Sequence, residues 1–585
     1  MLNVFLCLGL FVSHYTVNTE IIYQGFNSSF VPQWWQPCII YEVYVRSFKD
    51  SNGDGLGDLN GITEKVDYLK NLGVCAVWLS PVFKSPQLDF GYDISNFREI
   101  DPIYGTTHDF DRMLEKFHKA GIKVLLDFVP NHTSNMHDWF KKSVKKIDPY
   151  TDYFIWKDAK YVDGVRSPPN NWLSVFSGSA WEWSEGRQQY YFHQFLVEQP
   201  DLNYRNPKVH EEIKDVMRFW LDRGLDGFRI DAICHVYEKE DFADEPLSGK
   251  PGVLPTDYLY LDHPYTMQLP ENVGLVKEWD ELIYSYKKKE SDELKILVLE
   301  CYAPTKKLMP YYSNDSTCRS TFPFNFNLVE HMDRESDAQD LKTMISTWLI
   351  NMPEGSWANW VISNHDRDRI ASRMESTLLD GIHMIQMMLP GTAITYYGDE
   401  LGMENSYVRW DQVTDTFALN YGPERFQLVN RDPERSPFPW DDTKNAGFSD
   451  ASNVWLPIHP NFWADNMKQQ SKRKSHLRTY KQLARLRQNP TLIYGDLDMF
   501  TLSKWTFGFT RSYKDNPTYV VVVNFGSETE TVDLLKFRPT LPAILKVKVS
   551  SLNSGLVTGN LVNATSIFLR PKAGLVLITS YSNEV

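Results

Sequence analysis

L-D-G-F-R-I-D-A-I-C-H, residues 225–235, combines an apolar strand pattern with a cation and a carboxylate. Because side chains alternate along a strand, Arg229 and Asp231 are expected on the same face of it. A cation within a few ångströms favours the ionised form of a carboxyl group, and an ionised, positioned Asp is a competent nucleophile. A structural ion pair at the end of a strand is the alternative that this stretch leaves open.

Four further apolar runs also end in polar side chains. They are V-L-L-D-F-V-P-N-H with Asp127 and His132, I-L-V-L-E with Glu300, W-V-I-S-N-H-D with His365 and Asp366, and T-A-I-T-Y-Y-G-D-E with Asp399 and Glu400. Helical patterns alternate with these runs, which predicts an α/β protein whose parallel sheet closes as a barrel. In such barrels the functional groups stand at the carboxyl ends of several strands.

The bulk composition limits the classes of function. A chain of 585 residues is too long for one hydrophobic core and predicts two or three domains. The formal net charge is -14 and no long Lys/Arg stripe is present, which argues against nucleic acid or an anionic membrane as a partner. An apolar run of about ten residues near the amino terminus is too short to span a bilayer, and we expect a signal peptide at residues 1–19. The protein is therefore expected to be secreted and extracellular.

Periodicity divides the remaining chain into segments. Strands are expected at residues 39–48, 74–80, 123–127, 296–300, 358–363 and 393–397, and helices at 61–72, 109–120, 207–223, 276–289, 377–389 and 468–487. Residues 20–131 and 201–490 form the barrel in this interpretation, with an irregular insertion at about 402–466. The irregular, Trp-rich segment 132–200 is predicted to be an excursion domain, because a structureless loop of that length is uncommon. Alternating apolar runs predict an all-β domain, a β-sandwich, at residues 491–585.

The loop D-S-N-G-D-G-L-G-D-L-N-G, residues 50–61, resembles the first half of a calcium-binding loop. Asp50, Asn52 and Asp54 supply oxygens at alternate positions, and Asp58 with the Leu56 carbonyl could complete the set. The twelfth position is Gly61, so the bidentate Glu of an EF-hand is missing. A solvated turn is the alternative. Because this loop lies far in sequence from the strand-end carboxylates, the Ca²⁺ ion is expected to be structural. The chain has no Cys/His cluster of the kind that binds zinc.

Cysteines and sequons fit an oxidising compartment. Loss of the signal peptide would leave five of the six cysteines, so one stays unpaired within the chain. We predict a disulfide between Cys301 and Cys318, and we interpret Cys75 and Cys234 as small core residues. Asn27, Asn314 and Asn563 are candidate glycosylation sites. Asn131 also lies in a sequon, but its position beside the candidate site predicts that it is unmodified.

Several carboxylates on separate strand ends, without a zinc or thiol pattern, favour cleavage of a glycosidic bond. That reaction uses one carboxylate as nucleophile and one protonated carboxyl as acid, about 5–5.5 Å apart in retaining enzymes. Asp231, beside Arg229, is the expected nucleophile. Glu300 is the expected acid, because burial at a strand end preserves its proton.

The motifs D-F-V-P-N-H, G-F-R-I-D-A-I-C-H, I-L-V-L-E and I-S-N-H-D resemble, in order and spacing, the four signature regions of glycoside hydrolase family 13, the α-amylase superfamily. Q-P-D-L-N, residues 199–203, resembles a fifth region in its α-glucosidase branch, and the chain is similar to secreted insect maltases. The resemblance implies a (β/α)8 barrel with an excursion domain after the third strand, retention of the α configuration, a sugar substrate and no organic cofactor.

The resemblance also implies roles for individual residues. Asp231 would form the glycosyl-enzyme, Glu300 would act as acid and then base, and Asp366 would stabilise the transition state. The residues implied in substrate binding are Asp89, Tyr92, His132, Phe176, Phe195, Arg229, His365, Arg431 and Arg435. Asp89, Arg431 and Arg435 would close the pocket beyond one terminal glucose, which favours exo-action.

Three questions stay open. Ala232 is associated in this branch with α-1,4 preference, but a methyl-sized difference gives only about 10–200-fold discrimination. A non-catalytic receptor or transporter heavy chain on the same scaffold is the alternative, although such relatives lose catalytic residues and all three carboxylates are present here. Transglycosylation or sugar isomerisation would use the same residues. Oligomeric state is not predicted.

Overall fold

The computed structural model describes residues 23–26, 29–313 and 320–579. The expected signal peptide at residues 1–19, two candidate glycosylation sites, Asn27 and Asn314, and Cys318 lie outside these ranges. No helix within the described ranges is long and apolar enough to cross a bilayer.

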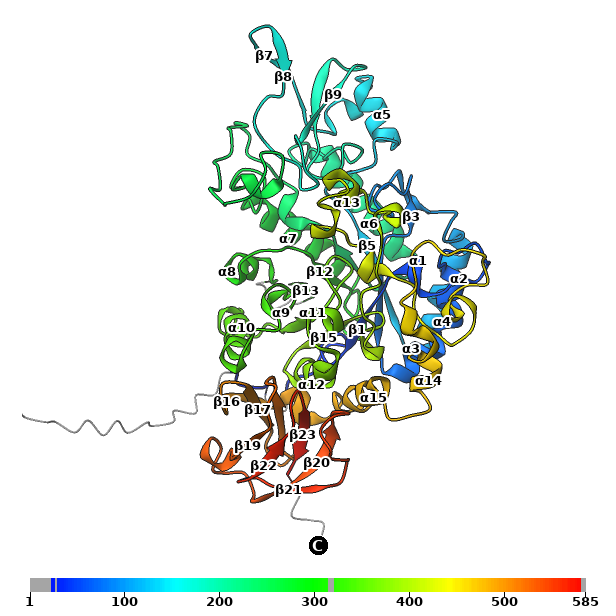
Figure 1. Ribbon diagram of the computed structural model, residues 1–585. Helices are drawn as coiled ribbons and strands as arrows, with labels where there is room; N and C mark the ends of the chain where they lie inside the picture. The colour runs from blue at the N-terminus through cyan, green and yellow to red at the C-terminus, as the bar shows by residue number, and fades with distance from the viewer. Residues whose placement is uncertain (1–22, 27–28, 314–319, 580–585) are drawn as a thin grey trace, which may run out of the picture.

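The centre of the molecule is an eight-stranded parallel sheet in which each strand lies beside its neighbours in chain order (Figure 1). The bounds are β1 Ile39–Val43, β2 Ala76–Leu79, β5 Lys123–Phe128, β11 Gly227–Ile230, β12 Ile296–Leu299, β13 Thr321–Pro323, β14 Asn359–Val361 and β15 Thr392–Tyr396. The seam between β13 and β14 is bridged by the Asn359 side chain, which accepts a hydrogen bond from the Asn325 N–H and donates one to the Pro323 carbonyl, both at 2.9 Å. The predicted (β/α)8 barrel is therefore confirmed.

The barrel strands are short and buried along nearly their whole length, as expected for parallel strands covered on both faces. Strand β13 was not predicted, because the three residues T-F-P carry no periodicity. The predicted strand at residues 39–48 is too long: β1 ends at Val43, and the short helix α1, Val45–Phe48, follows.

The helices that surround the barrel follow the predicted pattern with shifted ends. They are α2 Leu59–Glu64, α3 Val66–Leu72, α4 Thr107–Ala120, α6 Pro207–Asp222, α7 Glu271–Tyr284, α10 Ala338–Asn351, α12 Leu379–Met388, α14 Met467–Gln470 and α15 His476–Leu486. Helix α4 begins at a capping box between Thr106 and Asp109. Helix α10, like the strand β13 that precedes it, was not predicted. The single helix predicted at residues 468–487 is two helices, because the Ser475 side chain caps the start of α15.

An excursion between β5 and α6 stands above the barrel in Figure 1. It contains helix α5, Asp138–Val144, the three-stranded sheet of β6 Trp156–Lys157, β10 Gln189–Phe192 and β9 Trp181–Ser184, and the projecting hairpin of β7 Lys160–Val162 and β8 Val165–Ser167. Its small core is aromatic and includes Trp172, Trp181 and Phe192. The irregular composition thus reflects a separate small core rather than a structureless loop.

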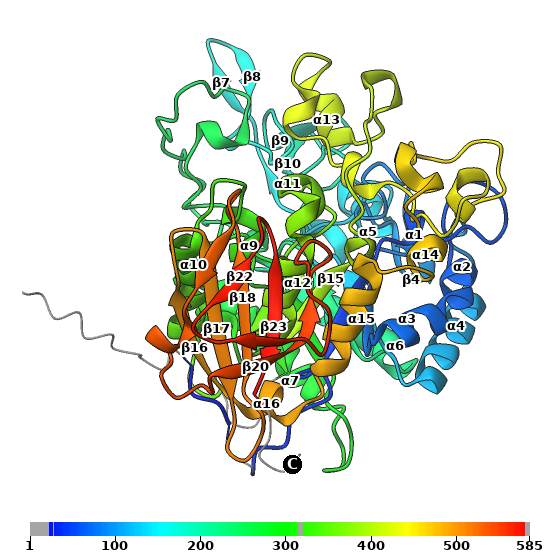
Figure 2. The ribbon, with the colours of Figure 1, turned by 60° about the horizontal axis from the view of Figure 1, so that its bottom comes forward.

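The carboxyl-terminal region is all-β and packs against α12 of the barrel (Figure 2). Its six-stranded antiparallel sheet contains β16 Asp496–Thr501, β17 Thr506–Ser512, β18 Tyr519–Asn524, β23 Gly574–Ile578, β20 Ile544–Ser550 and β21 Leu561–Asn563. The two-stranded sheet of β19 Glu530–Val532 and β22 Ile567–Leu569 contributes to a common apolar core with it, which includes Val520, Val522, Ile567 and Leu569. The predicted all-β domain is confirmed.

Two disulfides lie among the described residues, and neither is the one predicted. Cys38 pairs with Cys75, and Cys234 pairs with Cys301, with Cα–Cα distances of 5.7 and 5.5 Å. The predicted Cys301–Cys318 disulfide is wrong, and Cys75 and Cys234, interpreted as small core residues, are instead disulfide partners. Neighbouring parallel strands in register bring each pair to one level, so bonding distance comes from strand adjacency rather than from a short loop.

Candidate active site

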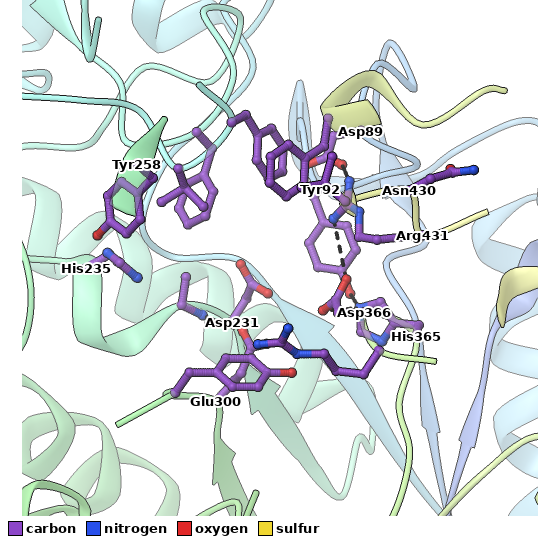
Figure 3. Close-up of a pocket in the computed structure, with 18 of the residues that line it drawn as sticks. Asp89, Tyr92, Asp231, His235, Tyr258, Glu300, His365, Asp366, Asn430 and Arg431 are labelled. Carbon is purple, nitrogen blue, oxygen red and sulfur yellow. Dashed lines mark hydrogen bonds and ion pairs between the residues drawn. The ribbon is translucent and has the colours of Figure 1, made fainter. Parts of the chain in front are cut away.

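A cavity of about 540 Å³ opens at the carboxyl ends of the barrel strands (Figure 3). Ten of the twelve residues predicted for catalysis or sugar binding line it: Asp89, Tyr92, His132, Phe176, Phe195, Asp231, Glu300, His365, Asp366 and Arg431. The other two, Arg229 and Arg435, lie behind this wall with 2% and 0% of their surface exposed. Arg229 and Arg435 influence the cavity through the carboxylates that they contact.

Arg229 connects the acidic side chains on the cavity floor. Its Nη1 lies 2.8 Å from Asp127 Oδ1 and 2.5 Å from Asp231 Oδ1, and its Nη2 lies 2.9 Å from Glu300 Oε1. Strands β11 and β12 pair with Ile230 opposite Leu299, so the next residue of each strand, Asp231 and Glu300, emerges at the same height. The two carboxyl groups therefore share one cation and face one cavity.

The pKa values of the carboxyl groups around Arg229 differ from the expectation. Burial raises the pKa of Asp231; Arg229 lowers it, whereas Glu300 and Asp127 raise it further, and the net direction is upward. Burial likewise raises the pKa of Asp127 to about 6, against the lowering effect of Arg229. The expected lowering by Arg229 is present but is outweighed, because one guanidinium faces three carboxylates in a desolvated site. Carboxyl groups that interact this closely titrate as a unit.

Asp366 has the opposite environment. Its Oδ1 accepts a hydrogen bond from Arg435 at 2.8 Å and lies 3.4 Å from Arg431, and its Oδ2 lies 3.3 Å from His365 Nε2. Burial would raise the pKa of Asp366, but His365, Arg435 and Arg431 lower it below its usual value. Asp366 is therefore an anion at neutral pH. His365 is held in place by Glu42, whose Oε1 lies 2.5 Å from Nδ1.

The far end of the cavity is closed by a buried ion pair. Arg431 Nη2 donates to Asp89 Oδ1 at 3.0 Å and to Asp415 Oδ1 at 2.7 Å. Gln199 Nε2 donates to the other oxygen of Asp89 at 3.0 Å. Asp415 belongs to the irregular insertion, and nothing in its sequence context signalled a role. Gln199, in contrast, opens the Q-P-D-L-N motif.

Aromatic rings form the sides of the cavity. Tyr92 stacks on His365 at 5.7 Å between ring centroids, and its hydroxyl donates to Asp127 Oδ2 at 3.0 Å. His132 lies 5.2 Å from Phe195, between ring centroids, and its Nε2 contacts the Tyr92 carbonyl at 3.1 Å. Phe176 stacks on Phe417, a second residue of the insertion that the sequence did not indicate, at 4.6 Å.

Further wall residues lie on the side opposite Asp89 and Arg431 in Figure 3, namely His235 and Tyr258. Tyr302 and Arg367 also line the cavity, with the guanidinium carbon of Arg367 5.2 Å from the Tyr302 ring centroid. His235 ends the opening motif and Arg367 follows Asp366 directly, so both could have been found as neighbours of predicted residues. None of the four was predicted.

The last pair of strand-end carboxylates does not reach the cavity. Asp399 accepts a hydrogen bond from Ser363 Oγ at 2.6 Å, and Glu400 accepts from the hydroxyls of Tyr41 at 2.8 Å and Tyr68 at 2.5 Å. Both are fully buried and absent from the cavity wall. Their role is to satisfy hydrogen bonds inside the barrel.

The predicted calcium loop forms a compact turn on the surface. Asp50 accepts hydrogen bonds from the backbone N–H groups of Asn52, Gly53 and Gly55, and Asp58 accepts from Ser51. Asn52 and Asp54 are exposed, whereas Asp50 and Asp58 are buried. Among the described residues no group of three or more His, Cys, Asp or Glu side chains is gathered closely enough to hold a metal ion.

The sequon asparagines differ in accessibility. Asn563 is exposed at the end of β21. Asn131 is 1% exposed and donates from its amide to Asp201 at 3.1 Å.

A model of the alpha-amylase catalytic domain matches residues 42–495. The chain belongs to this family. Maltase 1 from Drosophila virilis is 44% identical over 548 residues, which are 93% of this chain and 86% of that protein. The alpha-glucosidase of Apis mellifera is 41% identical over 537 residues, which are 90% of this chain and 93% of that protein. Both relatives are glycosidases by name, and the protein is a glycoside hydrolase.

Two other similar proteins have different names. The solved structure of the alpha-glucosyl transfer enzyme XgtA matches with a TM-score of 0.82 and 32% identity, covering 94% of this chain and 100% of that one. The human amino acid transporter heavy chain SLC3A1 is 37% identical over 555 residues, covering 93% of this chain and 78% of that protein. Similarity of this extent therefore spans different activities, and the site must decide between them.

Proposed function

We propose that this glycoside hydrolase is a retaining α-glucosidase that releases glucose from the non-reducing ends of maltose and short α-1,4-linked oligosaccharides. Sucrose is a second candidate substrate. The observation that carries the proposal is the bridge that Arg229 makes between Asp231 and Glu300 on the floor of one cavity. Cleavage with retention requires two carboxyl groups that flank the scissile bond about 5–5.5 Å apart, and Asp231 and Glu300 face one cavity from neighbouring strands.

In the first step Asp231 attacks the anomeric carbon of the bound glucose. The bond from that carbon to the leaving oxygen breaks, and Glu300 gives its proton to that oxygen, so the departing sugar leaves as a neutral alcohol. The proton donated in this step is placed on Glu300. Its transfer leaves Asp231 esterified and Glu300 ionised, so the number of charged carboxylates beside Arg229 stays the same.

In the second step Glu300 accepts a proton from a water molecule whose oxygen attacks the same carbon. The ester bond to Asp231 breaks, and the carboxylate returns to Arg229. Two inversions restore the α configuration, and the site ends with the proton on Glu300, as it began.

Asp366 is proposed to stabilise the positively charged transition state. His365, Arg435 and Arg431 lower the pKa of Asp366 against the raising effect of burial, and this keeps Asp366 anionic. His132 and His365, with Asp89 and Arg431, are proposed to bind the hydroxyls of the glucose. The Asp89–Arg431 ion pair blocks the cavity beyond one sugar, which supports action at chain ends rather than within a polymer.

The experiment that tests the function is hydrolysis of p-nitrophenyl α-glucoside by the wild type and by Asp231→Asn. We expect turnover by the wild type, release of α-glucose in the anomeric NMR signal, and a loss of at least about 10⁴-fold in kcat for the variant. Unchanged thermal unfolding would show that the variant is folded. A wild type that binds glucose mimics without hydrolysis would instead identify a carrier or heavy-chain role, and transfer of glucose to added maltose would identify a transferase.

We also propose that the loop with Asp50, Asn52, Asp54, Leu56 and Asp58 holds a structural Ca²⁺ ion. Oxygens at alternate positions are the donor set that this hard cation prefers. Burial raises the pKa of Asp50, but hydrogen bonds from Ser449 and from backbone N–H groups lower it below its usual value, so this carboxylate is charged and oriented. The ion would stabilise the loop that joins α1 to α2, away from the reacting carbon.

Secretion and glycosylation are further proposals. Two disulfides and an exposed sequon at Asn563 support an extracellular protein. Asn27 and Asn314 remain candidate sites from the sequence.

A further inference from the structure

The Cys234–Cys301 disulfide lies at the candidate reaction centre. Cys301 follows Glu300 directly, and Cys234 comes three residues after Asp231 on the short 3-10 helix η2, Ile233–His235. Both cysteines line the cavity, although only 1% and 2% of their surfaces are exposed. No other covalent bond in the described residues links two barrel strands at this end.

The backbone between the two carboxylates is held in an unfavourable conformation. Ala232 has φ 48° and ψ 34°, the left-handed region that residues with a Cβ rarely adopt. Its N–H donates to Glu300 Oε2 at 3.0 Å, and the next N–H, of Ile233, donates to the Glu300 carbonyl at 3.2 Å. Such a conformation persists only where the surroundings impose it.

Hydrogen bonds to Cys234 from the segment around the start of α7 hold this backbone conformation. The Cys234 carbonyl accepts hydrogen bonds from the Gln268 N–H at 2.7 Å and from Asn272 Nδ2 at 3.1 Å, at the start of α7. The turn after Asp231 is therefore fixed to α7 by hydrogen bonds and to the end of β12 by the disulfide. Loss of the covalent link would leave the strained turn free to relax away from Glu300.

We propose that the Cys234–Cys301 disulfide is a positioning element that sets the separation of the Asp231 and Glu300 carboxyl groups. The inference rests on the proposed function, because it concerns the geometry of the same two groups. It assigns the disulfide a role in the rate of reaction in addition to a role in stability.

The chain contains a matched control. The Cys38–Cys75 disulfide also joins neighbouring barrel strands, but it precedes β1 and β2 and so lies at the opposite end of the barrel. It closes a loop of 37 residues, against 67 for Cys234–Cys301, so removal of either bond should lower Tm by a similar amount. Only the Cys234–Cys301 disulfide lies beside the reacting groups.

The test compares Cys234→Ala/Cys301→Ala with Cys38→Ala/Cys75→Ala in the full chain, at a temperature where both are folded. We expect kcat for p-nitrophenyl α-glucoside to fall about 10–100-fold in the first variant only, since displacement of about 1 Å costs this much. The acid limb of its pH profile should also shift, because separation of the carboxyl groups changes how they share a proton. Cys234→Ser/Cys301→Ser, which keeps the volume without the bond, should not restore kcat.

Three results would overturn the inference: wild-type kcat in the first variant, equal losses in both variants, or full rescue by the Ser pair. If the Ala variant does not fold, the Ser pair and wild type reduced at Cys234 and Cys301, verified by mass spectrometry, replace it. Calorimetric binding of the cationic glucose mimic 1-deoxynojirimycin gives a second readout that needs no turnover. We expect about tenfold weaker binding in the first variant, whereas a wild type without glucosidase activity would instead disprove the proposed function.

Discussion

The guanidinium of Arg431 lies 3.0 Å from the carboxylate of Asp89, although 342 positions separate the two residues in the chain. Asp89 follows β2 of the barrel and Arg431 belongs to the insertion after β15. Both groups are largely shielded from solvent, with 5% and 12% of their side-chain surface exposed. This contact joins the segment after β2 to the insertion at one wall of the cavity.

Asp89→Asn should therefore impair binding of the terminal glucose. Asn at this position removes the charged partner on the glucose side of Arg431, which keeps Asp415 and Asp366, and loss of one member of a buried, hydrogen-bonded charge pair costs about 2–5 kcal/mol. We expect kcat/KM for maltose and for p-nitrophenyl α-glucoside to fall by the same factor, more than about 30-fold, because both substrates use the same glucose site. Glu99→Gln, which breaks the exposed pair with Lys84, is the control and should change neither value. A loss confined to maltose would contradict the placement of Asp89 beside the glucose.

Glu300→Gln should affect substrates according to their leaving groups. A poor leaving group such as the glucose of maltose needs a proton from Glu300, whereas 2,4-dinitrophenolate departs without one. We expect hydrolysis of maltose to fall at least about 10³-fold and the first step with 2,4-dinitrophenyl α-glucoside to fall far less, measured as a burst of phenolate. Equal losses on both substrates would remove the acid role.

Ala232→Val should change both linkage preference and stability. The larger side chain alters the space for the leaving sugar and should raise the isomaltose-to-maltose ratio of kcat/KM, within about 200-fold. A β-branched residue at positive φ is strained, so the free energy of unfolding should fall by about 1–3 kcal/mol. Ala232→Gly is the matched control: it tolerates this φ, and its Tm should not fall by a comparable amount. Equal Tm values for Val and Ala at this position would contradict the strain argument.

Glu400→Gln should reduce the loss of stability at alkaline pH. Burial raises the pKa of Glu400 from 4.5 to about 7, although hydrogen bonds from Tyr68 and Tyr41 lower it. A folded-state pKa above the unfolded value means that the stabilisation is present at low pH and is lost as pH rises through about 7. The difference in Tm between pH 6 and pH 8.5 should therefore be smaller for Glu400→Gln than for the wild type. Parallel Tm curves for the two proteins would exclude this group as the source.

Removal of calcium should lower stability without changing the chemistry of hydrolysis. We expect about one Ca²⁺ per chain by elemental analysis, and a lower Tm in EDTA that returns when Ca²⁺ is added. Asp54→Ala, at the exposed edge of the loop, should lose the ion and become insensitive to EDTA. Wild-type protein without bound metal and with the same Tm in EDTA would show that the loop is a solvated turn.

The barrel could be predicted from the sequence because each strand depends on residues that are close together in the chain. An apolar run of four to six residues that ends in a carboxylate is visible in one stretch, and alternation with helices fixes the order of neighbours. Strand β13 escaped prediction because three residues carry no period. The helix break at Ser475 depends on a cap rather than on periodicity, and so it was missed as well.

The sequence by itself determined the fold class, the residues at the ends of the strands, and the types of side chain available for reaction. Only the tertiary structure decided which of these groups meet. Arg229 joins three carboxylates, and burial with Glu300 and Asp127 raises the pKa of Asp231 although Arg229 lowers it. Asp415 supports Arg431, and Cys301 pairs with Cys234. The physical reason is the separation in sequence of the residues that each property depends on. Strand formation depends on neighbours within a few residues, whereas desolvation, charge sharing and disulfide bonding depend on distances between segments that only closure of the barrel brings together.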